Sequence, residues 1–112
     1  MKSILVVEDE ALIALMLEDM IEALGHRLHG VAASLEEGCA AAQTGDFDFA
    51  ILDCNLMGEK VWPIAQILAD RNVPFVFSSG GDILEIPEPH AQRPMLEKPY
   101  TFGAIAEILK QI

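Results

Sequence analysis

Apolar residues along this chain follow two spacings in turn, one typical of strands and the other of helices. Residues 3–7 form a continuous apolar run, as expected of a strand that is buried on both faces of a sheet. Residues 10–24 then carry apolar side chains at helical spacing, and Gly25 is placed to end that helix. The alternation continues, with strands expected at 27–33, 47–52, 75 to 78 or 79 and 95–97, and helices at 34–45, 60–71 and from 101 onward.

Capping residues support three of the helix starts. Ser34 can cap the second helix, with Glu37 three positions later as in a capping box. Pro63 belongs to the first turn of the third helix, where its missing N–H does least harm. Thr101 can cap the last helix.

Residues 80–92 interrupt the alternation. Two glycines open this stretch, Pro87 and Pro89 lie within it, and Pro94 follows just beyond. Because prolines break helices, we expect a loop with at most a short turn of helix where a fourth helix would otherwise stand.

Five strands that alternate with helices predict an α/β fold, a doubly wound five-stranded parallel sheet with helices on both faces. The sequence has no repeat or interdomain linker, so we expect residues 1–112 to form one domain with no output domain. In such sheets, ligands bind beyond the carboxyl ends of the strands. The residues at those ends are therefore the candidates for function.

Charge and composition limit the partners. The chain has 18 acidic and 7 basic residues and a net charge of −11, so a nucleic-acid partner is not expected. The first apolar run is too short for a signal peptide and no stretch reaches a membrane span, which predicts a cytoplasmic protein without a membrane partner. Cys39 and Cys54 have no metal or redox spacing and are expected to be free thiols.

Polar residues that can take part in catalysis or metal binding follow four of the expected strands at their carboxyl ends. They are Glu8, Asp9, Asp53, Ser79 and Lys98. Three carboxylates in one crevice repel one another unless a cation is present. Oxygen ligands suit a hard cation such as Mg²⁺.

This set of residues suits phosphoryl transfer. A carboxylate can act as a covalent nucleophile and form an acyl phosphate, while a metal and Lys98 balance the charge of the transferred group. The Ser79 hydroxyl can donate a hydrogen bond to a phosphoryl oxygen, and Gly80 beside it leaves space for phosphate and water.

Four segments in this order resemble a response-regulator receiver domain of two-component systems, over the whole length of the chain. The segments are VVEDE, ILDCNLMGE, FVFSSGG and EKPY. The chain is further similar to stand-alone single-domain receivers of alphaproteobacterial type, whose fourth strand usually ends in Phe-Ala-Thr-Gly. The resemblance implies a flavodoxin-like sheet of order 2-1-3-4-5 and suggests a cis peptide bond before Pro99.

The resemblance also implies a magnesium site and a phosphoacceptor. Asp53 would accept the phosphoryl group. Asp9 and Asp53, with the backbone carbonyl of Asn55, would coordinate Mg²⁺, and Glu8 would act mainly through a metal-bound water.

Ser79 and Lys98 would contact the phosphoryl group, which would come from a sensor histidine kinase or a histidine phosphotransfer protein. Signalling would proceed through a downstream protein or by onward phosphotransfer. The chain would be a monomer or weak dimer and would catalyse only its own phosphorylation and dephosphorylation.

Three features depart from the usual receiver pattern. The first acidic residue is Glu8 rather than an aspartate, and Met95 stands where an aromatic residue is frequent, three positions before the lysine. The segment between Ser79 and Lys98 is short and rich in proline. We therefore expect a loop that orders or moves to signal phosphorylation, in place of a regular helix.

Other functions fit the sequence less well. A degenerate receiver that binds partners without phosphate is the main alternative. An aspartyl-phosphate hydrolase of the haloacid-dehalogenase type requires a second aspartate where Asn55 stands. A flavin-binding protein requires a phosphate-binding loop after the first strand. Trp62 and Tyr100 are interpreted as packing or surface aromatics.

Overall fold

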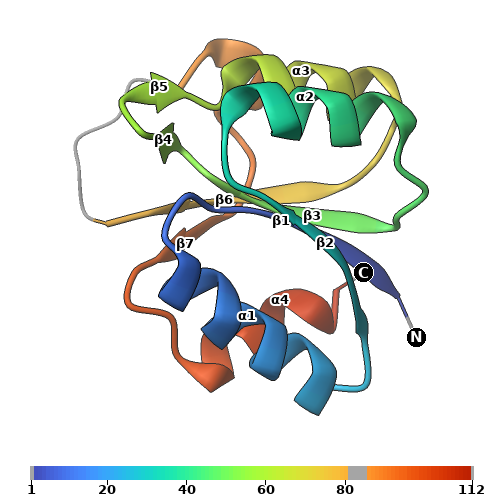
Figure 1. The fold of residues 1–112 in the computed structure, drawn as a ribbon, viewed down its shortest axis with the longest axis vertical. Coiled ribbons are helices and arrows are strands. Elements are labelled where there is room, and N and C mark those ends of the chain that lie inside the picture. The colour runs from blue at the N-terminus through green and yellow to red at the C-terminus, as the bar shows by residue number, and fades with distance from the viewer. Residues whose placement is uncertain (1, 81–85, 112) are drawn as a thin grey trace.

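A five-stranded parallel sheet forms the centre of the molecule (Figure 1). The computed structural model describes residues 2–80 and 86–111. The strands are β1 (Ser3–Val7), β2 (Arg27–Ala32), β3 (Phe49–Asp53), β6 (Phe75–Ser79) and β7 (Met95–Glu97). Their order is β2-β1-β3-β6-β7. Since β6 and β7 are the fourth and fifth strands of this sheet, the predicted order 2-1-3-4-5 is confirmed.

Two pairs of helices cover the sheet, one pair on each face (Figure 1). The pairs are α1 (Ala11–Ala23) with α4 (Phe102–Leu109), and α2 (Leu35–Thr44) with α3 (Trp62–Asp70). Alternate residues of β1 belong to the two cores: Ile4 and Val6 pack on the first side, Leu5 and Val7 on the second. This double burial explains the continuous apolar run in the sequence.

The expected caps are present. The Ser34 hydroxyl accepts the backbone N–H of Glu37 at 3.1 Å, and the Glu37 carboxylate in turn accepts the N–H of Ala33 at 3.2 Å. Thr101 Oγ1 accepts the N–H of Ala104 at 3.1 Å. Each contact satisfies a backbone donor that has no partner within its helix or turn.

Two predicted boundaries are wrong. The strand expected at 47–52 begins at Phe49, because Asp48 binds Ser3 through both its backbone N–H and its carboxylate before the chain joins the ladder with β1. The helix expected at 60–71 begins at Trp62, because a small hairpin precedes it. This hairpin consists of β4 (Asn55–Leu56) and β5 (Glu59–Lys60).

The turn of the hairpin has positive φ angles at both central positions. Met57 has φ 50° and Gly58 has φ 89°. Such a two-residue turn favours asparagine or aspartate before glycine. Because methionine stands at the first position, the sequence lacks the usual signal for this turn and the hairpin was not predicted.

The proline-rich segment forms a short turn of 3₁₀-helix at Glu88–His90, which confirms the prediction of no regular helix for residues 86–92; residues 81–85 lie outside the described part. His90 is buried, with its ring centroid 6.0 Å from that of Phe75 and 6.4 Å from that of Phe77. The Arg93 guanidinium lies 4.2 Å above the Phe75 ring centre. The segment therefore packs on β6.

None of the helices formed by the described residues has both the length and the apolar character that a membrane crossing requires. Cys39 and Cys54 are free thiols, as predicted.

Gly38→Ala is expected to lower the free energy of unfolding by about 1 kcal/mol. Alanine gains about 1 kcal/mol of helix propensity over glycine. A Cβ at position 38 would overlap Ile64 Cδ1 on the facing helix, and overpacking of a core costs about 1–3 kcal/mol. Urea unfolding measures the difference.

Gly103→Ala in α4 is the matched control, since its Cβ would meet no described atom within 4 Å. This substitution should raise the free energy of unfolding by about 0.5–1 kcal/mol. Equal effects of the two substitutions would contradict the close α2–α3 approach as the cause.

Candidate functional site

The predicted site residues meet at the carboxyl edge of the sheet. Glu8 and Asp9 directly follow β1, and Asp53 ends β3, the neighbour of β1. Ser79 ends β6 and Lys98 follows β7. Parallel strands bring all these chain ends to one side.

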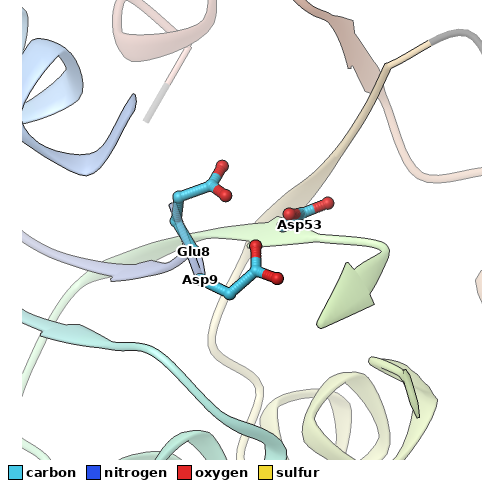
Figure 2. A group of neighbouring side chains, drawn as sticks. All are labelled: Glu8, Asp9 and Asp53. Carbon is cyan, nitrogen blue, oxygen red and sulfur yellow. The ribbon is translucent and has the colours of Figure 1, made fainter. Parts of the chain in front are cut away.

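Three carboxyl groups surround one space in Figure 2. Glu8, Asp9 and Asp53 each offer one oxygen, and these oxygens all lie within 4.8 Å of one another. Glu8 is 1% exposed and Asp53 is 6% exposed, whereas Asp9 is half-buried. Grouped carboxylates of this kind attract a cation.

Lys98 joins two of these carboxylates. Its Nζ lies 2.9 Å from Glu8 Oε1 and 3.1 Å from Asp53 Oδ2. Its backbone N–H donates to the Ser79 carbonyl at 2.9 Å, one position beyond the β6–β7 ladder. The Lys98–Pro99 peptide bond is cis, as the resemblance suggested.

One ammonium does not balance the carboxylates around it. Burial raises the pKa of Glu8 to about 7, with Asp53 contributing in the same direction. The ion pair with Lys98 and the N–H of Glu10 act against this rise. The pKa of Lys98 lies above its ordinary value because Glu8 and Asp53 outweigh its own burial. The site therefore carries excess negative charge that a divalent cation would neutralise.

The hairpin is tied to this acidic group. Asp9 Oδ2 accepts the backbone N–H of Met57 at 2.9 Å, and Asp53 Oδ1 accepts the N–H of Asn55 at 3.3 Å. Asn55 Oδ1 is buried and has no hydrogen-bond partner among the described residues. Asp9 Oδ1 is not used in these contacts.

A cleft of about 260 Å³ lies over the acidic group. Its lining residues are Asp9, Glu10, Asp53, Asn55, Gly80 and Lys98. A Cβ at Gly80 would meet no described atom within 4 Å, which agrees with the open space predicted there. A hard cation fits this donor set of carboxylate and carbonyl oxygens.

Comparison with known proteins identifies the family. No protein-family model and no curated protein sequence matches the chain. The solution structure of SdrG from Sphingomonas melonis Fr1 is 42% identical, with 98% of this chain and 94% of that chain covered and a TM-score of 0.87. The BeF3-activated conformation of SdrG is 41% identical, with 96% and 92% covered and a TM-score of 0.81.

The PhyR response regulator REC domain of Erythrobacter litoralis is 25% identical, with 98% of this chain and 88% of that chain covered and a TM-score of 0.79. The chain belongs to the response-regulator receiver domains. This membership gives the receiver a role in two-component signalling.

The receiver domain of the sensor histidine kinase PA1611 from Pseudomonas aeruginosa PAO1 shares the fold at 20% identity, with 98% and 95% covered and a TM-score of 0.79.

The two adjacent serines of this receiver have different surroundings. Ser78 is fully buried, and its Oγ accepts the Tyr100 hydroxyl at 2.6 Å. Ser79 is half-buried at the end of β6, next to Gly80 in the cleft. Ser79 therefore stays the candidate for contact with a phosphoryl group.

Two residues at or next to the receiver site were not among those predicted. Glu10 lines the cleft, and the hydroxyl of the buried Tyr100 donates a hydrogen bond to Ser78 Oγ. Tyr100 follows Lys98 by two positions, so its proximity could have drawn attention to it. Its hydrogen-bond partner depends on how β6 and β7 are placed in space, which the local pattern does not encode. Met95 lies on β7 with its side chain partly exposed.

In the metal-free receiver, the Glu8 carboxyl is expected to titrate near pH 7 instead of its ordinary value of 4.5. Lys98→Met should raise this midpoint because the ion pair is lost, and Asp53→Asn should lower it because a like charge is lost. Carbon NMR of the side-chain carboxyl group follows the titration.

The pKa of Glu8 is higher in the folded state than in the unfolded state. Between these two pKa values the folded state therefore binds more protons than the unfolded state. The contribution of Glu8 to stability is thus full below about pH 4.5 and is lost as the pH rises through about 7. A wild-type midpoint near 4.5, or shifts of the same sign in both variants, would refute this account of the site.

Proposed function

We propose that this receiver is a switch that accepts a phosphoryl group on Asp53 with the help of Mg²⁺. The observation that carries the proposal is the position of Asp53 in an open cleft, 3.1 Å from the Lys98 ammonium and among two further carboxylates. The BeF3-activated form of SdrG, which is similar over almost the whole chain, supports it.

The reaction forms an acyl phosphate. An oxygen of the Asp53 carboxylate attacks phosphorus, and the bond between phosphorus and the donor breaks as the donor leaves with its electron pair. Lys98 stays protonated because Glu8 and Asp53 keep its pKa high. Its ammonium offsets the charge that Asp53 receives, and Ser79 donates its hydroxyl to a phosphoryl oxygen beside the open space at Gly80.

Asp9, Asp53 and the backbone carbonyl of Asn55 are the residues that would hold Mg²⁺, with Glu8 acting through a water. Bound there, Mg²⁺ would neutralise charge on the phosphoryl oxygens. The excess negative charge of the cleft and its oxygen donors support this assignment. The PA1611 receiver domain, which has the same fold, has a magnesium ion coordinated in its active-site cleft.

The proposed phosphoryl donor is a sensor histidine kinase or a histidine phosphotransfer protein. The message would pass to a downstream protein or to a further phosphotransfer partner, and the chain would catalyse only its own phosphorylation and dephosphorylation. The cytoplasmic location and the state of monomer or weak dimer stay predictions.

A receiver-like module that binds partners without phosphate is the second candidate. It is favoured by the pairing of Lys98 with Glu8 and Asp53, which leaves the site internally bonded without any ligand. A measurement of whether Asp53 becomes phosphorylated distinguishes the two candidate functions.

The wild-type chain is expected to gain the mass of one phosphoryl group when it is incubated with Mg²⁺ and acetyl phosphate. Asp53→Asn should gain none, because the amide is not a nucleophile of this kind. Intact mass spectrometry measures the change, with a chelator added as a further control.

If wild type stays unlabelled while a control receiver is labelled, and beryllofluoride also produces no spectral change, the phosphorylation switch is refuted. The module that binds without phosphate would then be the better interpretation.

Asp9→Asn is expected to weaken Mg²⁺ binding by about tenfold or more, because one negative ligand is replaced by a neutral one. The asparagine carbonyl oxygen can still accept the N–H of Met57, so the hairpin should keep its place. Calorimetric titration with Mg²⁺ measures the dissociation constant.

Glu10→Gln serves as the matched control, since Glu10 lines the cleft but lies outside the group of three carboxylates. Its effect should stay below about threefold, as expected for a less direct electrostatic contact. Equal losses in both variants would show that the general charge of the cleft, rather than ligation by Asp9, governs Mg²⁺ affinity.

A further inference from the structure

A buried hydroxyl pair lies beside the candidate site and takes no part in the function proposed above. The Tyr100 hydroxyl donates to Ser78 Oγ at 2.6 Å, with Tyr100 6% exposed and Ser78 fully buried. Loss of either hydroxyl would leave the other buried and without this partner. A hydrogen bond of this kind resists disruption.

This pair anchors the chain immediately after Lys98. The backbone N–H of Lys98 itself donates to the Ser79 carbonyl at 2.9 Å. Two positions later, Tyr100 is bound to Ser78, the preceding residue of the same strand. Lys98 is therefore held between two attachments to the end of β6.

The strand that carries both attachments is also the neighbour of the proposed phosphoacceptor. Ser78 is the register partner of Asp53, and the Ser78 carbonyl accepts the N–H of Cys54 at 3.0 Å. Tyr100 thereby connects residues 98–100 to Ser78, the backbone position directly beside Asp53.

Packing against α1 restrains residues 98–100 less than the attachments to β6 do. A cavity of about 300 Å³ separates part of α1 from these residues, with Ile13 and Met16 on one side and Lys98, Pro99 and Tyr100 on the other. The ion pairs of Lys98 involve Glu8 and Asp53, the carboxylates at which a metal and a phosphoryl group would bind, so these pairs would change with the ligands. The Tyr100–Ser78 bond does not depend on those ligands.

We propose that Tyr100 is a positioning residue for phosphoryl transfer, and that its hydrogen bond to Ser78 determines where the Lys98 ammonium lies relative to Asp53. This inference rests on the proposed function. Because phosphoryl transfer depends on positioned charge, a small displacement of the ammonium slows the reaction.

The test compares labelling by acetyl phosphate in wild type, Tyr100→Phe, Ser78→Ala and the double variant, at saturating Mg²⁺. Each single variant should lower the maximal labelling rate by about tenfold. The double variant should be no slower than the singles, because the same bond is lost in each. The dissociation constant of Mg²⁺ should stay within about twofold of wild type, since the metal ligands are untouched.

Thr101→Ala is the matched control for stability. It removes the cap of α4 next to Tyr100 and lowers the melting temperature, but leaves the Tyr100–Ser78 bond in place. Its maximal labelling rate should equal that of wild type.

A wild-type rate in Tyr100→Phe, multiplicative losses in the double variant, or equal slowing in Thr101→Ala would each overturn the positioning role while the proposed function stands. Labelling that is absent from wild type itself would overturn the proposed function and this inference together.

Discussion

The ammonium of Lys98 between Glu8 and Asp53 is the interaction on which the rest of the site depends. Both carboxylates are buried, and buried like charges destabilise a fold unless a partner compensates them. Lys98 supplies one positive charge to these two carboxylates at 2.9 and 3.1 Å, and Asp9 adds a third carboxylate, so negative charge is in excess. The same arrangement thus keeps the site folded without a metal and makes it attractive to one.

The strand order explains why one lysine can serve both carboxylates. β1 and β3 are neighbours, so Glu8 and Asp53 emerge side by side, whereas β7 lies beyond β6 at the edge of the sheet. Lys98 must reach across the end of β6, which requires a long side chain and a well-placed turn. The small residues Ser78, Ser79 and Gly80 at the end of β6 leave room for that reach and supply the backbone and hydroxyl contacts that hold the turn.

Much of this arrangement could be predicted from the sequence, because it follows from elements with strong periodicity. Residues at the carboxyl ends of parallel strands converge in space whatever the details, which is why Asp53 and Lys98 could be named in advance. The hairpin at β4 and β5 was missed because two-residue strands show no alternation and Met57 is an unusual residue for its turn. The Tyr100–Ser78 bond was missed because it depends on the placement of two segments far apart in sequence.

Glu8 shows how a departure from the family pattern can be read once the geometry is known. One of its oxygens accepts the N–H of Glu10 at 3.1 Å, and the other pairs with Lys98. The extra length of glutamate is thus used to bend the carboxylate back into the protein. Glu8 is accordingly expected to act on a metal through a water, while its ion pair with Lys98 stays in place, so that direct ligation depends on Asp9 and Asp53. A longer side chain at this position then changes the electrostatic balance of the site more than its ligand count.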